Sequence, residues 1–178
     1  MGHKHTKSDI LGAALEAALD DGLSQLTFGR LAKRIGISDR VIVYYFPTKA
    51  DLIGEVIVAM GLELQASLAE AFTTPAADHL EMTRTAWPLL AVPENDRVFA
   101  LFFEANGLAA VGREPYASLV PSLVAGWIDW AASLIEGTPA QRSAQAEGAI
   151  AMVEGLILIR LLAGSKAANR AAKTIGVA

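Results

Sequence analysis

Few side chains of this sequence could do metal or covalent chemistry. It has three histidines and no cysteine, which excludes thiolate nucleophiles, thiolate metal ligands and disulfides. His3 and His5 could form a short metal-binding tail motif, but a solvated start of the chain is the simpler interpretation. His79 and Glu81 lack the i and i+4 spacing that places two ligands on one helix face. The sequence therefore predicts no metal site and no cofactor.

Motifs of enzyme chemistry are also absent. We find no glycine-rich phosphate loop, no nucleophile elbow and no cysteine–histidine pairing. A ligand-processing enzyme would need such a constellation to position its reacting groups. We therefore expect no catalytic residues and a protein that is not an enzyme.

Basic side chains near the N-terminus suit a different chemistry, the recognition of a polyanion. Residues 1–49 carry seven basic and five acidic side chains, whereas residues 50–178 carry eight basic and fourteen acidic ones, for a net charge of −4. A basic end on an acidic body is typical of a DNA-binding head whose remainder must stay off DNA. Arg40 is the best candidate to read guanine, because one guanidinium can donate two hydrogen bonds to that base edge.

The elements that must position these side chains are helices. Apolar residues recur at spacings of three and four along nearly the whole chain, and alternating strand patterns are absent. Side chains that can cap a helix and glycines that can end one divide the pattern. The expected helices cover residues 8–21 (capped by Ser8), 28–35 (capped by Thr27), 38–45 (capped by Ser38), 48–72 (with Asp51 completing a capping box), 78–91, 94–111, 116–135 and 139–162 (opened by Thr138).

The turn between the second and third helices is Ile35-Gly36-Ile37-Ser38. Glycine permits a sharp backbone turn, Ile37 can fill the gap between the helices, and Ser38 can satisfy the next helix's free amides. Two helices joined in this way make a helix-turn-helix, whose second helix can enter the DNA major groove.

The residues around this turn resemble the N-terminal signature of the TetR family of regulators. The resemblance lies in residues 31–38 (LAKRIGIS) and 44–52 (YYFPTKADL), and it extends over roughly residues 7–57. It implies an all-α fold with a helix-turn-helix DNA-binding domain at 1–47 and a helical effector-binding and dimerisation domain at 48–178. It also implies a cytoplasmic repressor that binds palindromic operator DNA as a homodimer and is released by a small molecule.

The resemblance further implies which residues face DNA. Helix N-termini and lysine attract phosphate, which suits Thr27 and Lys49. Val43 stands where the family usually has tyrosine, so it could pack on a thymine methyl instead. Asp39 could accept from cytosine or only orient Arg40, and Phe46 is expected in the core. The predicted DNA-binding residues are Thr27, Ser38, Asp39, Arg40, Val43, Tyr44, Tyr45 and Lys49.

A repressor of this kind needs an effector site, and large apolar side chains in the middle helices are the candidates. They are Met82, Trp87, Phe99, Phe102, Phe103, Glu104, Tyr116 and Trp127, and a small hydrophobic effector would suit them. Each of them could equally be an ordinary core residue. Glu104 could neutralise a cationic ligand, pair with Arg97 or face water.

The last two predicted helices are apolar on several sides and must be covered by something, which favours a four-helix dimer interface over a buried core without a partner. The predicted interface residues are Leu123, Trp130, Leu134, Met152, Val153, Leu156, Ile157 and Leu161. We expect the tail after Gly164 to be frayed. The alternative to a repressor is a helical small-molecule binding protein with a vestigial DNA head.

Overall fold

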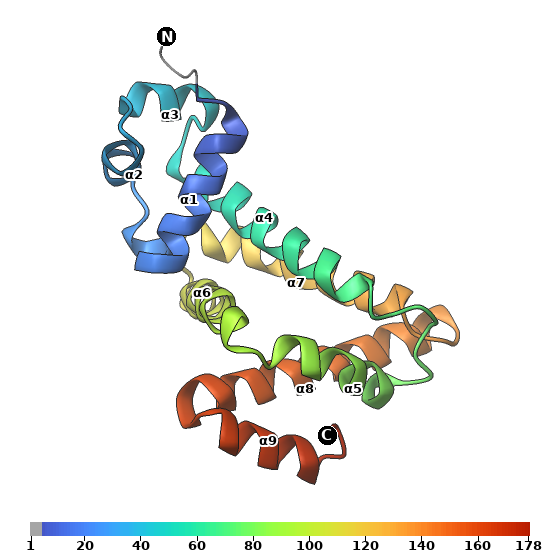
Figure 1. Cartoon of the computed structure of the whole chain (residues 1–178). Coiled ribbons are helices and arrows are strands. Elements are labelled where there is room, and N and C mark those ends of the chain that lie inside the picture. Colours follow the sequence, from blue (N-terminus) through green and yellow to red (C-terminus); the bar gives the residue numbers. More distant parts are fainter. Residues whose placement is uncertain (1–4) are drawn as a thin grey trace. The chain divides into compact units, whose positions relative to one another are not determined.

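The computed structural model describes residues 5–178, so His3 lies outside the described part of the chain. Helices make up its regular structure, which confirms the all-α prediction (Figure 1). The helices are α1 (Lys7–Asp21), the single 3₁₀ turn η1 (Leu23–Gln25), α2 (Phe28–Ile35), α3 (Asp39–Tyr45), α4 (Lys49–Ala69), α5 (His79–Leu90), α6 (Pro93–Ala110), α7 (Tyr116–Ser133), α8 (Pro139–Ala163) and α9 (Ser165–Thr174).

Polar caps define where most of these helices begin. Thr27 accepts a hydrogen bond from the Arg30 amide, and Thr138 forms a capping box with Gln141, both as predicted. The prediction that Ser8 caps α1 is wrong. Thr6 caps it, in a capping box with Asp9, because the acid that completes the box lies three residues after Thr6.

The described residues form two compact units. The first comprises the described part of Met1–Glu63 together with Ala100–Val120, and the second comprises Leu64–Phe99 and Pro121–Ala178. Helices α4, α6 and α7 contribute residues to both units. We call residues 5–47, with α1, η1, α2 and α3, the reading head.

The reading head has a small core in which each helix buries one side. Ile10 of α1, Leu31 of α2 and Ile42 of α3 are at most 1% exposed, and Phe46 after α3 is fully buried. Fully burying such a side chain stabilises a fold by about 1.5–3 kcal/mol. Three short helices can therefore hold one another although none of them is long enough to be stable alone.

Helix α8 is the centre of the second unit, and α5 and α9 pack on it (Figure 1). Helix α5 comes close to α8 at Gly148, where an added Cβ would lie in van der Waals contact with the His79 ring, at 3.5 Å. The His79 amide donates to Gln145 of α8 at 3.0 Å. The buried Arg160 guanidinium of α8 donates two hydrogen bonds to the Asp96 carboxylate of α6, at 2.6 and 3.1 Å.

The expectation of a frayed tail is wrong, because residues 165–174 form α9. Alanine is the strongest helix former, and this segment has four. Ala168 and Ala172 lie four residues apart, so they share one face, and both are fully buried. Gly164 breaks α8 with a φ of 86°, which lets the chain reverse so that this alanine face packs on α8. Beyond α9, Arg84 of α5 donates to the Gly176 carbonyl at 2.6 Å.

Helix α4 is, within the described residues, the one helix whose length and composition would suit a membrane span. One side of this helix is instead directed inward, and Leu52, Ile53 and Val56 are fully buried in the protein. Thr48 and Asp51 form a capping box at its start. Helix α4 is therefore a core helix.

Candidate nucleic-acid interface

The turn between α2 and α3 has the geometry that the sequence predicted. Gly36 adopts φ 71° and ψ 32°, the left-handed region that glycine enters without strain. Its amide donates to the Ala32 carbonyl, and the Ile37 amide donates to the same carbonyl at 3.1 Å. These bonds close α2 and turn the chain sharply into α3.

Helix α3 is anchored on one side and open on the other. Ile42 and the following Phe46 are fully buried, and they fasten the helix to the head. Val43 is 42% exposed and Tyr44 is 80% exposed, and Arg40 is exposed as well. Helix α3 has seven residues and buries one of them, Ile42. So short a helix would not be stable alone in water, so the head holds it in place while most of its side chains remain exposed.

The helix starts beside this surface are open to solvent. Ser38 caps α3 by accepting from the Arg40 amide at 3.3 Å, and Thr27 does the same for α2 through Arg30. Lys49 is exposed at the start of α4. The unpaired amides of a helix N-terminus and a nearby lysine both suit an anionic phosphate.

The three aromatic residues after Val43 have separate environments. Phe46 is in the core, as predicted. Tyr45 is half-buried, and its hydroxyl donates to the His5 carbonyl at 3.5 Å. Tyr44 packs the edge of its ring against Tyr45, with ring centroids 5.0 Å apart, and otherwise faces outward. Both tyrosines are predicted DNA-binding residues, and Tyr44 is the more accessible of the two.

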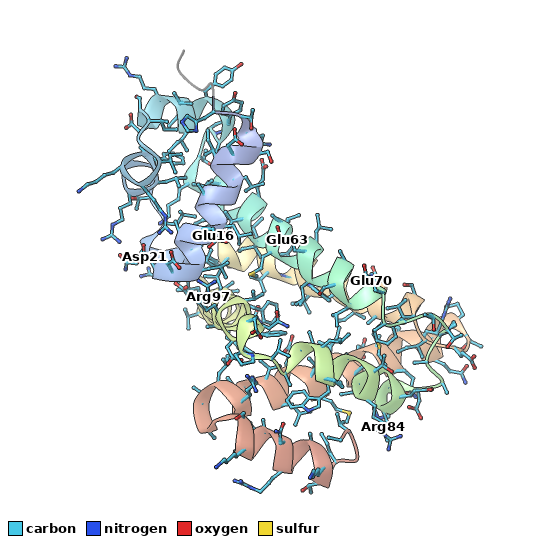
Figure 2. The ribbon with its side chains drawn as sticks, in the orientation of Figure 1. Glu16, Asp21, Glu63, Glu70, Arg84 and Arg97 are labelled. Carbon is cyan, nitrogen blue, oxygen red and sulfur yellow. The ribbon has the colours of Figure 1, made fainter. Side chains whose placement is uncertain are left out.

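Ion pairs that the sequence analysis missed brace the head. Arg34 of α2 binds Asp20 of α1 at 2.5 Å, and its other nitrogen lies 4.0 Å from Asp21. The hydrogen bond that Arg34 donates to the Asp20 carboxylate raises the pKa of the Arg34 guanidinium. Lys7 lies 2.7 Å from Glu55 of α4 and sits over the Phe46 ring, 5.3 Å from its centroid. The acids at the C-terminal half of α1 can be followed from the labels in Figure 2.

An open groove of about 500 Å³ lies on the head, and no predicted effector residue lines it. Its lining, from the segment that runs from α1 to α2, combines three apolar side chains with three basic ones, one acid and one amide. The residues are Ala17, Asp21, Gln25, Leu26, Arg30, Leu31, Lys33 and Arg34. Within residues 5–178, no group of three or more histidines and acids is arranged to hold a metal ion.

The predicted effector residues divide between the two units, and half of them are buried. Met82 packs in a cluster with Ala131 and Ile135, and Trp87 and Phe99 are 4% and 6% exposed. In the first unit, Tyr116 is 5% exposed, yet its hydroxyl has no hydrogen-bond partner among the described residues. Burial raises the pKa of the Tyr116 hydroxyl, and the nearby Glu104 carboxylate adds to this rise.

Glu104 makes contacts that the sequence analysis did not anticipate. Its carboxylate accepts hydrogen bonds from the Leu23 amide at 2.8 Å, from the Ser24 amide at 2.9 Å and from the Ser24 hydroxyl at 2.5 Å. No sequence signal could have paired these residues, because they lie 80 positions apart. An acid within an apolar helical stretch was the only available indication of a special role.

The predicted dimer residues are not all at the surface. Leu156 and Ile157 are 3% and 0% exposed within a single chain, so they belong to its core. Leu123, Trp130, Leu134, Met152, Val153 and Leu161 are half-buried. The large exposed apolar side chains of α8 are instead those of Leu158, Ile159 and Leu162.

Comparison with known proteins identifies the reading head. Residues 10–56 match the family model described as bacterial regulatory proteins of the tetR family. The matched span contains α2, the turn and α3 in full. No curated protein matched the sequence.

The whole chain has the fold of solved regulators. A TetR transcriptional regulator from Legionella pneumophila is 22% identical, with 98% of this chain and 97% of that chain covered and a TM-score of 0.66. A TetR-family regulator from Agrobacterium tumefaciens is also 22% identical, with 96% and 94% covered and a TM-score of 0.67. A Rhodococcus protein assigned to the same family is 19% identical, with 94% and 95% covered and a TM-score of 0.71. Residues 10–56 therefore match the DNA-binding domain of the tetR family, and the whole chain has the fold of these solved regulators.

Proposed function

We propose that this regulator is a cytoplasmic, ligand-responsive repressor that binds palindromic operator DNA as a homodimer and releases it when a small hydrophobic effector binds. The observation that carries the proposal is the open side of α3, where Arg40, Val43 and Tyr44 are exposed while Ile42 and Phe46 hold the helix from behind. A helix with these dimensions and this support fits a major groove.

Several exposed residues each have a proposed contact with DNA. Arg40 reads a guanine edge, Val43 packs on a thymine methyl, and Thr27 and Lys49 hold phosphates at the starts of α2 and α4. Tyr44 is supported as the outer aromatic contact by its exposure. We propose that residues 1–47 bind DNA and that residues 48–178 bind the effector and the second subunit.

An effector is supported by the buried hydroxyl of Tyr116. A buried polar group without a hydrogen-bond partner costs about 1–3 kcal/mol, so the position favours a ligand group or a water molecule that would pair with it. Two further predicted effector residues, Phe102 and Phe103 of α6, pack edge to face with centroids 5.7 Å apart. They favour an effector that is mainly apolar.

A homodimer is supported by the exposed apolar side of α8. Leu158, Ile159 and Leu162 are 41%, 38% and 80% exposed. Exposed leucine and isoleucine side chains gathered on one helix are typical of an interface. Two copies related by a two-fold axis would cover them and would present two reading heads to half-sites about 34–36 Å apart.

The test is to select duplexes from a random-sequence library with the purified protein, and then to measure binding by fluorescence anisotropy at two salt concentrations. We expect a palindromic sequence, two chains per duplex, and affinity that falls as salt rises, because phosphate contacts release counterions. Selection of no sequence by a well-folded protein would contradict the proposal and favour the small-molecule binding protein with a vestigial head.

A further inference from the structure

The short turn η1, which joins α1 to α2, begins at a residue that cannot cap it. Gly22 has no side chain, so the amides of Leu23 and Ser24 need acceptors from elsewhere. Glu104 of α6 supplies them, with its two carboxylate oxygens 2.8 Å from the Leu23 nitrogen and 2.9 Å from the Ser24 nitrogen. The Ser24 hydroxyl donates a third hydrogen bond at 2.5 Å. We call this set of three bonds the Glu104 clamp.

The backbone at Gly22 is fitted to the same carboxylate. Its φ of 89° is open to glycine and strained for other residues. A Cβ at this position would lie 2.9 Å from a Glu104 oxygen, which is closer than van der Waals contact allows. Two independent constraints, conformation and space, therefore leave glycine as the residue that lets the carboxylate reach the two amides.

The position of η1 links the clamp to the reading surface. Leu23 is fully buried and Leu26 is 3% exposed, so the segment is fixed in the core of the head. Thr27 follows immediately and caps α2, which turns through Gly36 into α3. A shift of η1 therefore changes the direction in which α2 begins, and α3 moves with it.

The other end of the clamp is part of a long helix. Glu104 lies between Leu101 and Ala105, which are 3% and 1% exposed, so this stretch of α6 is packed firmly. Residues 93–99 of the same helix belong to the second compact unit. Since a helix can transmit displacement along its axis, α6 connects residues of the second unit to the carboxylate that holds η1.

We infer that Glu104 is a positioning residue for DNA reading: its carboxylate on α6 holds η1 and thereby sets the orientation of α2 and α3. This inference rests on the proposed function and adds to it the residue through which α6 controls the head. Tyr116 supports it, since the Glu104 charge reaches that unpartnered hydroxyl. A polar effector group bound to Tyr116 would then act on the same carboxylate that holds the head.

The variant that tests the clamp is Glu104→Gln. Glutamine keeps the size of the side chain but has one oxygen acceptor, and its amide group would face a donor, so one backbone amide of η1 loses its partner. We expect amide hydrogen exchange at Leu23 and Ser24 to become about tenfold faster, without DNA present. We also expect affinity for the selected duplex to fall about tenfold, while affinity for a scrambled duplex is unchanged.

Two further variants make the result specific. Glu94→Gln removes an exposed charge from the first turn of the same helix, and we expect neither readout to change. Ser24→Ala removes only the third bond of the clamp, so we expect a smaller loss of selective affinity in the same direction. This milder variant retains both backbone bonds and serves if Glu104→Gln does not fold.

The outcomes separate the inference from the proposed function. Faster exchange with a loss of selective affinity supports the inference. Faster exchange with unchanged selectivity would overturn it, because Glu104 would then be a local brace. Equal loss on both duplexes with a lower melting temperature would also overturn it, since the whole head would be disturbed. If the wild-type protein itself selects no duplex, the proposed function fails, and the positioning role in DNA reading fails with it whatever the exchange rates are.

Discussion

The reading head and α8 of the second unit use burial in different ways. Helix α3 buries Ile42 alone among its seven residues and leaves Asp39, Arg40, Val41, Val43 and Tyr44 exposed. Helix α8 packs against α5 and α9 and buries even a charged residue, Arg160. The head therefore exposes the polar and aromatic side chains of a short helix that is held by a few buried residues close in sequence. Helix α8, in contrast, depends on partners that lie far away in the sequence.

The largest effect should come from the buried charge of α8. We expect Arg160→Met to lower the free energy of unfolding by about 3 kcal/mol, because the Asp96 carboxylate loses both hydrogen bonds and its counterion. Urea denaturation measures this change. Arg170→Met, at an exposed position of α9, should cost less than about 0.5 kcal/mol. Equal losses of unfolding free energy in the two variants would contradict the view that the buried Arg160 contributes more to stability than an exposed arginine.

The head should respond in the opposite way, through binding rather than stability. Arg40→Ala is expected to weaken binding to the selected duplex about tenfold and to relax the preference at one base position. The unfolding transition should stay where it is, since Arg40 is exposed. Anisotropy titration checks the first point, with Lys166→Ala on α9 as the control. A destabilised Arg40→Ala protein would contradict the view that α3 is supported from one side.

Local caps should act equally in both regions. Thr6 and Thr138 each form a capping box, at the starts of α1 and α8. We expect Thr6→Ala and Thr138→Ala each to cost about 1 kcal/mol of unfolding free energy, because each leaves a helix amide without its acceptor. Thr→Ser at either position should keep most of the wild-type unfolding free energy, because serine retains the hydroxyl that accepts the hydrogen bond. A much larger cost at Thr138 would mean that capping, too, depends on tertiary packing in the second unit.

The smallest effect concerns pH. Burial raises the pKa of the Glu154 carboxyl on α8. The folded state therefore holds this proton more tightly than the unfolded chain, so the contribution to stability is present at low pH and is lost as pH rises through the folded-state pKa. Glu154→Gln, which resembles the protonated form, should gain stability relative to wild type between about pH 4 and pH 7.

The matched control for this effect is Glu147→Gln, two turns earlier on the same helix. Glu147 is exposed, so the difference from wild type should not change with pH over the same range. Thermal melts at several pH values measure both variants. A parallel response of the two would show that the pH dependence does not come from burial at Glu154.

Much of the head could be predicted from sequence because its signals are local. Thr27, Ser38 and Gly36 act on residues within four positions of themselves, and the structure has them in these roles. The first helix start was predicted at Ser8 rather than Thr6 because two hydroxyl residues stand close together and the acid at Asp9 decides between them. The braces of the head, such as Arg34 with Asp20, join different helices and left no sequence signal.

In the second unit, periodicity predicted the helices but not what they face. Leu156 and Ile157 were expected at a dimer surface and are buried, while Leu158 and Leu162 on the same helix are exposed. An apolar stripe has no mark that distinguishes core from interface, because both bury the same kind of side chain. The alanine-rich end of the chain looked like a tail because its apolar side chains are small, and the structure shows that they pack on α8.

The sequence by itself determined the all-helical architecture and the helix-turn-helix, since caps, glycine turns and apolar spacing act over a few residues. Only the tertiary structure decided which apolar faces are core, that Arg160 meets Asp96, and that Glu104 caps a turn 80 positions away. The physical reason is the distance along the chain over which each interaction acts. A hydrogen bond between distant segments forms only where the fold brings them together, and the residues next to either partner in the sequence do not predict it.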